Sequence, residues 1–335
     1  MDKIEKNFAS VTMNLLLLPI RFVAAWMFFS AAWRRLVLDG AKMDPNNAAW
    51  IGGKINTFYP HALGIKPLLY YLLTNPDLLN IFMWFFTFIE FTVGFCVAFG
   101  LVSRLAALGV TVLSFSMLLG AGWLGATCLD EWQIGSFGIA IGVILFMSGS
   151  GNFSLDAVIG RRWPSWIKQP MSWITSGNFV SEGTGRKLIY GLTAFTVIAM
   201  LWTNQAFVGG LWGPLSNPSA KPHVQIDQIS AKGTQVTIKV FRDGGPDTYG
   251  AFVTELVAED ANGTVLADLR GEHLSAVMKK ATIQNSFPLK VKAGPDGIII
   301  PLGAEAIVNL DLGKDVSNVT KITLRDVSGV KWVSK

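Results

Sequence analysis

The sequence predicts a membrane α-helical bundle followed by an all-β domain outside the membrane. Of its 335 residues 51% are hydrophobic and 15% are charged, well below the charged fraction of about 25% that is usual for soluble globular domains. Five apolar runs of spanning length fill the first two-thirds of the chain. Short runs of alternating polar and apolar residues fill the rest, as half-buried strands require.

The first predicted span covers residues 14–33, because an apolar run of about 20 residues can cross the hydrocarbon core. The second and third spans cover 78–102 and 105–124, and the fourth covers 133–148. A fifth span follows at 188–208. The predicted organisation is a four-span membrane domain (1–150), a basic loop (151–187), the fifth span (188–208), a linker (209–222) and a β domain (223–335).

The basic residues between the spans predict the orientation. Lys3, Lys6, Arg104 and the 151–187 loop fall on one side, which the positive-inside rule assigns to the cytoplasm. We therefore expect an inner-membrane protein with a cytoplasmic N-terminus and an extracytoplasmic β domain. The outer loop 34–77, in which residues 63–73 form a candidate interfacial helix, carries five Lys or Arg against three Asp. Positive charge on the outer side favours binding of an anion.

The last third of the chain has the pattern of a β-sandwich. After a linker rich in Gly, Pro and Ser, turn dipeptides separate alternating runs, as hairpins require. The three dipeptides are Asn262-Gly263, Asp296-Gly297 and Ser328-Gly329. The predicted strands cover residues 224–229, 234–241, 251–260, 264–269, 297–302, 306–312 and 319–327.

The turn between the third and fourth spans gathers reactive side chains on a Gly-rich segment, GAGWLGATCLDEWQIG. It holds Cys128, Asp130, Glu131, Trp123 and Trp132. Function concentrates on loops held by a rigid scaffold, so this turn is a candidate site. The alternative is that Cys128 is a small buried hydrophobe and the two tryptophans anchor the chain at the membrane surface.

Arg21 and Glu90 lie deep inside predicted spans. A lone charge there is costly, so both side chains are expected to face the bundle interior and to meet each other. They form either a structural ion pair or a site that handles protons or a quinone.

A second group of charges, Arg34, Arg35 and Lys42, lies at and beyond the outer end of the first span. These side chains either anchor the span at the interface or form a cationic rim for an anionic substrate, since guanidinium groups suit tetrahedral oxyanions.

Several classes of function lack their sequence patterns. No basic stripe or recognition motif for nucleic acid is present. There is no haem, flavin or metal motif, and His61, His223 and His273 are too scattered to predict a metal site. Cys96 lies on an apolar run and is expected to serve packing.

Two stretches of the membrane half resemble the DoxX/DoxD family. One is the first span, with Arg21 inside it and Arg-Arg at its end, and the other is FIEFTVGF…GLVSRLAALG at 88–109. The turn GATCLDEWQIG resembles DoxD more narrowly, and the β domain after a fifth span resembles DoxA. The chain is thus similar to a fused DoxD–DoxA thiosulfate:quinone oxidoreductase. The resemblance implies oxidation of thiosulfate to tetrathionate at the outer face and transfer of two electrons to a membrane quinone.

For that reaction we assign roles from position alone. Cys128 would be the nucleophile, with Asp130 and Glu131 moving protons, although acids beside a thiol oppose thiolate formation unless a cation offsets them. Arg34, Arg35 and Lys42 would bind thiosulfate. The predicted quinone-binding residues are Trp123, Trp132, Arg21 and Glu90. Expected partners are thiosulfate, quinone, the lipid bilayer, and a second copy of the chain or a respiratory-chain partner.

Two other functions are compatible with parts of the pattern. The chain could be a non-catalytic, membrane-anchored binding or assembly subunit of a respiratory complex, with the β domain recognising a partner. A transporter would use Arg21 and Glu90 as a coupling site, but the broken helices or inverted repeats of such proteins are not evident in the sequence.

Overall fold

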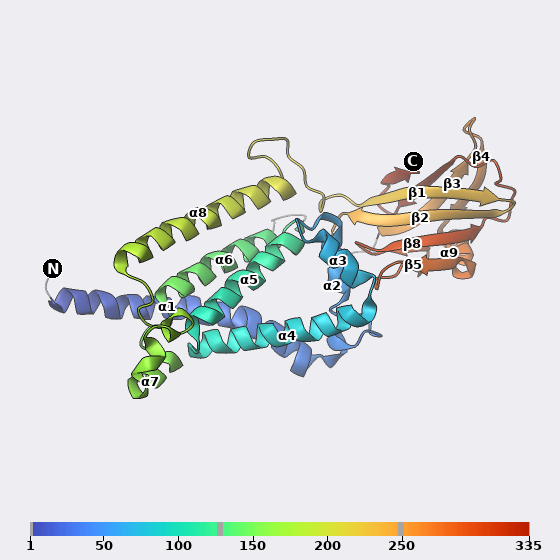
Figure 1. The fold of residues 1–335 in the computed structure, drawn as a ribbon. Helices are drawn as coiled ribbons and strands as arrows, with labels where there is room; N and C mark the ends of the chain where they lie inside the picture. Colours follow the sequence, from blue (N-terminus) through green and yellow to red (C-terminus); the bar gives the residue numbers. More distant parts are fainter. Residues whose placement is uncertain (1–2, 126–129, 247–250, 335) are drawn as a thin grey trace. The chain divides into compact units, whose positions relative to one another are not determined.

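The computed structural model describes residues 3–125, 130–246 and 251–334, and it combines a bundle of long helices with a β-sandwich (Figure 1). Within the described residues, four helical segments are long and apolar enough to cross a membrane. They are Leu15–Leu38, Pro76–Phe99, Ser103–Ala121 and Asp130–Ser148. Together with two antiparallel sheets after residue 222, they confirm the predicted fold class.

Two spans have ends that differ from the predicted ones, and both differences involve residues of the candidate site. Helix α1 (Lys3–Trp33) continues directly into the π-helical segment η1 (Arg34–Leu38), so Arg34 and Arg35 belong to the first candidate span instead of lying beyond it. Helix α6 (Asp130–Ser148) begins three residues earlier than predicted, because Asp130 and Glu131 complement the positive end of the helix. Helices α4 (Pro76–Phe99) and α5 (Ser103–Ala121) match their predicted spans within three residues at each end.

Small residues bring the helices of the bundle close together. A Cβ atom added to Gly94 of α4 would lie 2.6 Å from the backbone nitrogen of Phe29 on α1, and one on Gly142 of α6 would lie 2.8 Å from that of Thr111 on α5. Glycines at such crossings let two helix backbones approach, the usual packing mode in a bilayer. The antiparallel pair α1–α4 is therefore held with Phe29 opposite Gly94, which fixes which side chains face each other along both helices.

Helix α8 (Glu182–Phe207) covers all but the last residue of the predicted fifth span, 188–208. It is not among the four helical segments of the described residues that are long and apolar enough to cross a membrane. Its 26 residues are long enough to cross a bilayer. Its exposed surface is largely apolar and includes Tyr190, Ile198 and Trp202. The fifth span stays a prediction.

The segment between α6 and α8 is folded around Asp156. It contains α7 (Leu155–Arg162) and the 3-10 turns η4 (Pro164–Ile167) and η5 (Met171–Trp173). The Asp156 carboxylate is fully buried and accepts hydrogen bonds from Val102 N, Ser103 N and Oγ, Ser176 N and Trp166 Nε1. One carboxylate thus ties the α4–α5 turn to this segment.

Two sheets share the core of the β domain. The four-stranded sheet has the order β1 (His223–Lys232), β2 (Gln235–Gly244), β8 (Glu305–Asp311), β5 (Thr282–Asn285). The second has the order β10 (Lys331–Val333), β9 (Lys321–Asp326), β3 (Ala251–Glu259), β7 (Gly297–Ile300), β6 (Lys292–Gly294), with β4 (Val265–Arg270) also paired to β3. Buried Ile238 and Val308 from one sheet and Leu256 and Leu324 from the other belong to the same cluster.

The sequence located the long strands and missed the short elements. All seven predicted strands are present, and the three turn dipeptides connect β3–β4, β6–β7 and β9–β10. Helix α9 (Gly271–Lys280) and the short strands β5, β6 and β10 were not predicted. Strands of three or four residues are too short to show a clear alternation, which explains their omission.

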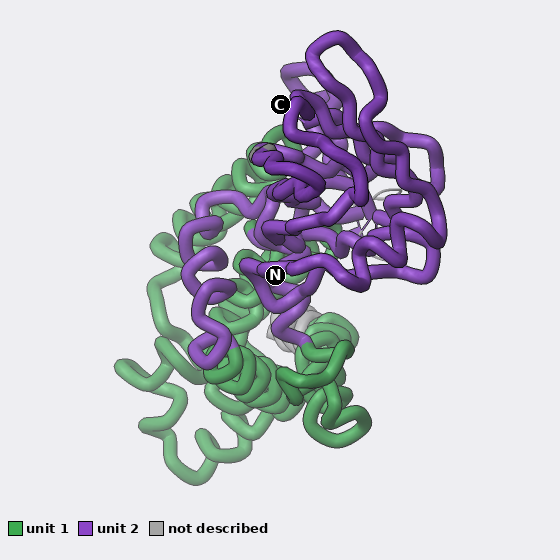
Figure 2. The backbone as a smooth tube through the Cα atoms, turned by 90° about the vertical axis from the view of Figure 1, so that its right-hand side faces the viewer, with its two compact units in different colours: residues 1–50, 80–119, 131–206 green, residues 51–79, 120–130, 207–335 purple. Residues whose placement is uncertain are grey.

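The structure divides into two compact units that do not follow chain order (Figure 2). Unit 1 comprises residues 1–50, 80–119 and 131–206, which form most of the helical bundle. Unit 2 comprises residues 51–79, 120–130 and 207–335. Unit 2 therefore joins the β domain to part of the predicted outer loop, which contains α2 (Gly53–Phe58), η3 (Tyr59–His61) and α3 (Lys66–Leu73), and to the predicted turn site. Helix α3 lies within the segment 63–73 predicted to be a short interfacial helix, and its interfacial position stays a prediction.

Candidate functional site

A buried ion pair joins the end of the first span to α4. Arg35 Nη1 donates to Glu90 Oε2 and, at 3.1 Å, to Thr87 Oγ1. Thr87 and Glu90 lie three residues apart and so share one face of α4. The side chains of Arg35 and Glu90 are only 12% and 10% exposed. Arg35 belongs to the π-helical segment, a backbone form that often occurs at functional sites.

The predicted pairing of Arg21 with Glu90 is wrong. Arg21 Nη1 instead donates to the backbone carbonyl of Ser150 at 2.9 Å. The reason is the register of the two antiparallel helices: with Phe29 opposite Gly94, Glu90 comes level with the Arg35 end of α1. Arg21 lies 14 residues before Arg35, a distance of about 21 Å along a helix. Both charges face the interior, as predicted, but at different depths.

The three cations predicted to bind thiosulfate have different surroundings. Arg35 is committed to Glu90, whereas Arg34 is exposed and donates from Nε to Ser30 O at 3.3 Å. Lys42, on the short turn η2 (Gly40–Met43), lies 3.7 Å from Asp39. Arg34 is therefore the most accessible guanidinium of the group for an anion. Their binding role stays a prediction.

The predicted turn site is described in part. Residues 126–129, and with them Cys128, lie outside the described residues. Asp130 is exposed at the start of α6, and Glu131 and Trp132 follow on the same helix. Trp132 Nε1 donates to Thr203 Oγ1 of α8 at 3.0 Å, so its indole nitrogen links α6 to α8. Cys96, in contrast, is buried within the hydrophobic core of unit 1, as expected for a packing residue.

Trp123 is a packing residue at the base of this turn. Its side chain is 1% exposed, and its Nε1 donates to Phe58 O at 3.1 Å. The ring of His61 meets it edge-on, with 4.7 Å between centroids. A ring so deeply buried could stack on a quinone only after its neighbours moved, so the structure lends no geometric support to the stacking role predicted for Trp123.

His61 connects the turn to the β domain. Its Nε2 lies 2.8 Å from the backbone oxygen of Asp243 on β2, and because that oxygen can only accept, Nε2 carries the proton. The ring therefore keeps Nδ1 as its basic atom. Burial lowers the pKa of His61, and the nearby Asp243 opposes that shift only in part. His61 is thus a neutral imidazole at neutral pH.

Asn56 of α2 makes a second connection to the β domain. It is fully buried, its Nδ2 donates to Gly303 O at 3.1 Å, and its Oδ1 accepts from Leu289 N at 3.2 Å. Around it, Tyr59 packs on Phe287 and Phe241, with 5.4 and 6.0 Å between ring centroids. Burial raises the pKa of the Tyr59 hydroxyl. These contacts explain why residues 51–79 fold with the β domain.

The three histidines have different surroundings. His61 and His223 both contact Asp243, the latter through Nδ1 and the carboxylate at 2.5 Å, whereas His273 is exposed on α9. Within the described part of the chain, no group of three or more His, Cys, Asp or Glu side chains could hold a metal ion.

Sequence reasoning missed Thr87, Asn56 and the functional placement of His61. Thr87 could have been found, since it shares a helix face with Glu90 at a spacing of three residues. Asn56 and His61 carry no comparable pattern, because their partners Gly303 and Asp243 lie far along the chain.

Comparison with protein-family models gives two matches. A model described as TQO small subunit DoxD matches residues 16–182, and a model described as TQO small subunit DoxA matches residues 207–335. The first match contains the helices that carry Arg35 and Glu90, and the second contains the β domain.

Proposed function

Because the chain belongs to the DoxD and DoxA families, joined in one polypeptide, we propose that it is a thiosulfate:quinone oxidoreductase of the membrane. In this proposal it oxidises thiosulfate to tetrathionate at its outer face and reduces a membrane quinone. The coarser conclusion, a membrane protein related to TQO, follows from the two family matches and the four apolar helices.

The overall reaction consumes two thiosulfate dianions, one quinone and two protons, and it yields one tetrathionate dianion and one quinol. Thiosulfate cannot enter lipid, whereas a long-chain quinone cannot leave it. A protein that joins the two must work where its helices meet water. The turn between α5 and α6 and the Arg35 end of the first span are the parts of the sequence that fit this requirement.

The observation that best supports the proposal is the double contact of His61. Its Nε2 bonds a strand of the DoxA-family domain, while its ring packs on Trp123 in the DoxD-family turn. Trp123 precedes Cys128 by five residues. Residues of both families therefore contact each other near the start of the turn that carries the predicted nucleophile. In this proposal the β domain helps to position that turn.

A covalent route through Cys128 balances atoms and electrons. The Cys128 thiolate forms an S–S bond with the terminal sulfur of one thiosulfate, and the two electrons released reduce the quinone, which takes up two protons. A second thiosulfate attacks that same thiosulfate sulfur, releases tetrathionate and restores the Cys128 thiolate. Asp130 and Glu131 are the proposed proton carriers at the turn, and Arg34, with Lys42, binds the dianion, since the predicted third cation, Arg35, is bonded to Glu90.

The Arg35–Glu90 pair supports a quinone site on the membrane side. Ionisable groups inside membrane spans are costly and are usually retained for function. In this proposal Glu90, bonded to Arg35 on the same helix face as Thr87, takes up protons and relays them to the reduced quinone. We add Arg35 to the quinone-binding residues predicted from sequence, Trp123, Trp132, Arg21 and Glu90. Arg21, bonded to Ser150 O at another depth, and Trp123, whose ring is buried, are the least supported of these.

The proposal is tested by an anaerobic assay of the purified full-length protein in detergent. Thiosulfate and a short-chain quinone are added, and quinol and tetrathionate are measured together. One quinol per tetrathionate is expected. Quinol formation without tetrathionate would contradict the proposed product, and no reaction with any of several benzo- and naphthoquinones would contradict the enzyme assignment.

The family descriptions favour one second candidate, since both contain the word subunit. In that case the chain is a membrane-anchored binding or assembly component, and a partner polypeptide completes the oxidoreductase. The same assay separates the two, because a subunit alone would give no quinol until the partner is added.

A further inference from the structure

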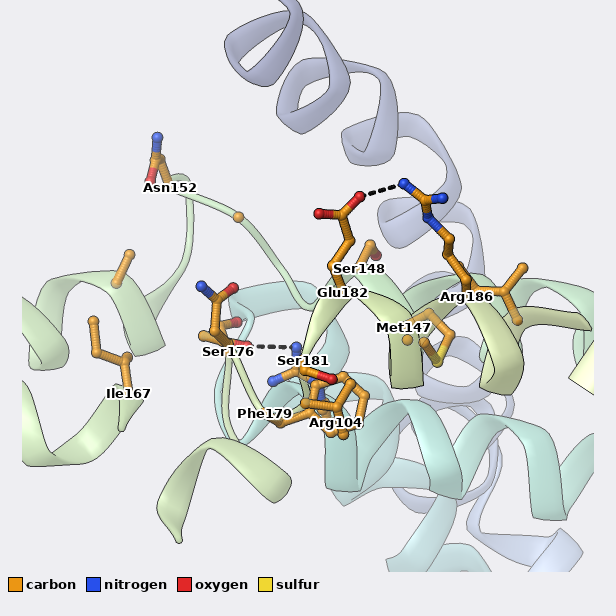
Figure 3. Close-up of a pocket in the computed structure, with 17 residues that line it drawn as sticks. Arg104, Met147, Ser148, Asn152, Ile167, Ser176, Phe179, Ser181, Glu182 and Arg186 are labelled. Atoms are coloured by element: carbon orange, nitrogen blue, oxygen red, sulfur yellow. Dashed lines mark hydrogen bonds and ion pairs between the residues drawn. The ribbon is translucent and has the colours of Figure 1, made fainter. Parts of the chain in front are cut away.

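A second site lies at the end of the bundle where α6 finishes and α8 begins, which we call the Arg104 end. A cavity of about 560 Å³ opens there, entirely within unit 1 (Figure 3). Its volume is in the range of small-molecule sites. The lining includes Arg104, Asn152, Phe179, Ser181, Glu182 and Arg186.

Arg104 is a buried cation with hydrogen-bonding capacity to spare. Its side chain bonds three backbone carbonyls, with Nη1 donating to Ser172 O at 2.7 Å and to Thr175 O at 2.5 Å, and Nη2 donating to Gly177 O at 2.7 Å. Its guanidinium stacks on Phe179, with 4.1 Å to the ring centroid. Arg104 is 2% exposed, and its Nε has no partner among the described residues. A buried donor without a partner is costly, and an anion in the cavity would supply one.

Among the described residues, no carboxylate hydrogen-bonds to Arg104. Asp156 interacts with it through charge alone, because both Asp156 oxygens accept the hydrogen bonds described above. Glu182, which also lines the cavity, pairs with Arg186. The hydrogen bonds of the Arg104 guanidinium go to neutral carbonyls, so an anion in the cavity can add a direct ion pair.

The rim of the cavity can complete an anion site. Arg186 pairs with Glu182 at 2.5 Å, but both side chains are mostly exposed, at 70% and 82%. Such surface pairs contribute little free energy and exchange partners readily. Asn152 and Ser181 add an amide and a hydroxyl donor. Residues 150–187 carry five basic side chains against two acids, so the surroundings also favour an anion.

The surface around the cavity has the character of a lipid interface. Four exposed aromatic or apolar side chains flank Arg161 and Arg162 in the sequence. Phe153, Val158, Trp163 and Trp173 are 58%, 54%, 60% and 49% exposed. Tryptophan beside basic residues is typical of the head-group level of a bilayer. Met147 and Ile189 give the cavity an apolar wall next to its polar one.

We propose that this cavity binds the phosphate of an anionic phospholipid, held between Arg104 and Arg186, with the glycerol end against Met147 and Ile189. The ligand chemistry is a phosphate ester, and the interfacial surroundings favour a lipid over free phosphate. The site lies apart from the Arg35–Glu90 pair and does not depend on the proposed redox function.

The test is a titration of the purified full-length protein in detergent by calorimetry. The probes are dihexanoyl phosphatidylglycerol, dihexanoyl phosphatidylcholine and inorganic phosphate. The anionic lipid is expected to bind, and the zwitterionic lipid to bind at least about tenfold more weakly, because its choline opposes the two arginines. Equal binding of the two lipids overturns the proposal. Inorganic phosphate that binds as tightly as the lipid supports the phosphate site but overturns the assignment to lipid.

Three variants distinguish specific binding of the lipid in the cavity from non-specific electrostatic attraction to the basic surface. Arg186→Gln should weaken binding of the anionic lipid by about fivefold, and Glu182→Gln should strengthen it by about threefold. Arg162→Gln removes the same charge from an exposed residue outside the lining and should leave affinity unchanged. Equal weakening by Arg186→Gln and Arg162→Gln overturns the proposal. The lipid affinity of Arg104→Lys is interpreted only if this variant unfolds at the same temperature as the parent protein, because Arg104 also bonds three backbone carbonyls.

Discussion

Gly303 lies against the backbone of Asn56 so closely that a Cβ atom on Gly303 would come 1.8 Å from the Asn56 carbonyl oxygen. Gly303 also has a φ of +76°, which disfavours other residues. The contact joins the predicted outer loop to the DoxA domain, and it leaves no room for a side chain.

Gly303→Ala is expected to destabilise unit 2 by overlap as well as by backbone strain. Gly313→Ala is the matched control, because Gly313 has a φ of +69° with nothing within 4 Å of the added Cβ. The control should cost about 1–2 kcal/mol in free energy of unfolding, and Gly303→Ala about 1–3 kcal/mol more. Thermal unfolding of the detergent-purified variants measures both. Equal losses would mean that Asn56 and Gly303 are not in contact.

Arg35 and Glu90 are expected to show a large coupling energy in a double-mutant cycle. Arg35→Gln or Glu90→Gln alone leaves a charge buried without its partner and should cost about 3–5 kcal/mol, whereas the double variant should recover part of that loss. The parallel cycle of Arg21→Gln with Glu90→Gln should be additive, since those residues do not meet. Thermal stability in detergent gives both coupling energies, and a larger coupling for Arg21 would refute the pairing.

Cys128 is expected to be the reactive thiol and Cys96 an inert one. Cys96 is buried in the core of the bundle, so a membrane-impermeant thiol reagent should label Cys128 alone, and thiosulfate should protect it. Cys128→Ser should abolish thiosulfate-dependent quinone reduction, while Cys96→Ser keeps most of it. Substantial activity in Cys128→Ser would exclude the covalent route and favour direct electron transfer.

Arg34 is the guanidinium predicted to contribute most to thiosulfate binding, because it is exposed and makes one hydrogen bond, to Ser30 O. Arg34→Ala should raise the KM for thiosulfate by about three- to tenfold and leave the KM for quinone unchanged. The control is Arg161→Ala, which removes an exposed guanidinium from the Arg104 end. An unaltered thiosulfate saturation curve for Arg34→Ala would eliminate this role.

The lowered pKa of His61 predicts a pH dependence of stability. Burial lowers the pKa, so the folded protein binds fewer protons at this ring than the unfolded chain, whose His pKa is about 6.5. The contribution is therefore fully present above about pH 6.5 and is lost as the pH falls below it. Unfolding midpoints between about pH 7.5 and pH 5.5 should fall less steeply for His61→Gln than for the parent. Exposed His273→Gln should follow the parent, and identical slopes for all three proteins would contradict the prediction.

The sequence was sufficient for the fold class because length, hydropathy and alternation are local properties. Four spans, seven strands and three turns follow from them. The partner of Glu90 does not, because it depends on the register of α1 against α4, which Gly94 and Phe29 set by close packing. Hydropathy predicts that the first span ends at Trp33. In the structure the helix continues through Arg34 and Arg35, because the π-helical segment keeps the backbone hydrogen-bonded although these side chains are charged.

Unit 2 also escapes sequence reasoning. Its three segments are separated by spans, and the two hydrogen bonds that Asn56 Nδ2 and His61 Nε2 donate to the β domain are made to backbone oxygens. Every residue type carries a backbone carbonyl, so the sequence does not show which residue accepts such a hydrogen bond.

The joining of both families in one chain has a consequence for the small contact at Asn56. A tethered β domain meets residues 51–79 as an intramolecular neighbour, at an effective concentration on the order of millimolar. At that effective concentration, a few hydrogen bonds and a cluster of aromatic rings are sufficient to keep the β domain bound to residues 51–79. The tether also fixes the ratio of the two domains at one to one, so each membrane bundle is made together with one β domain.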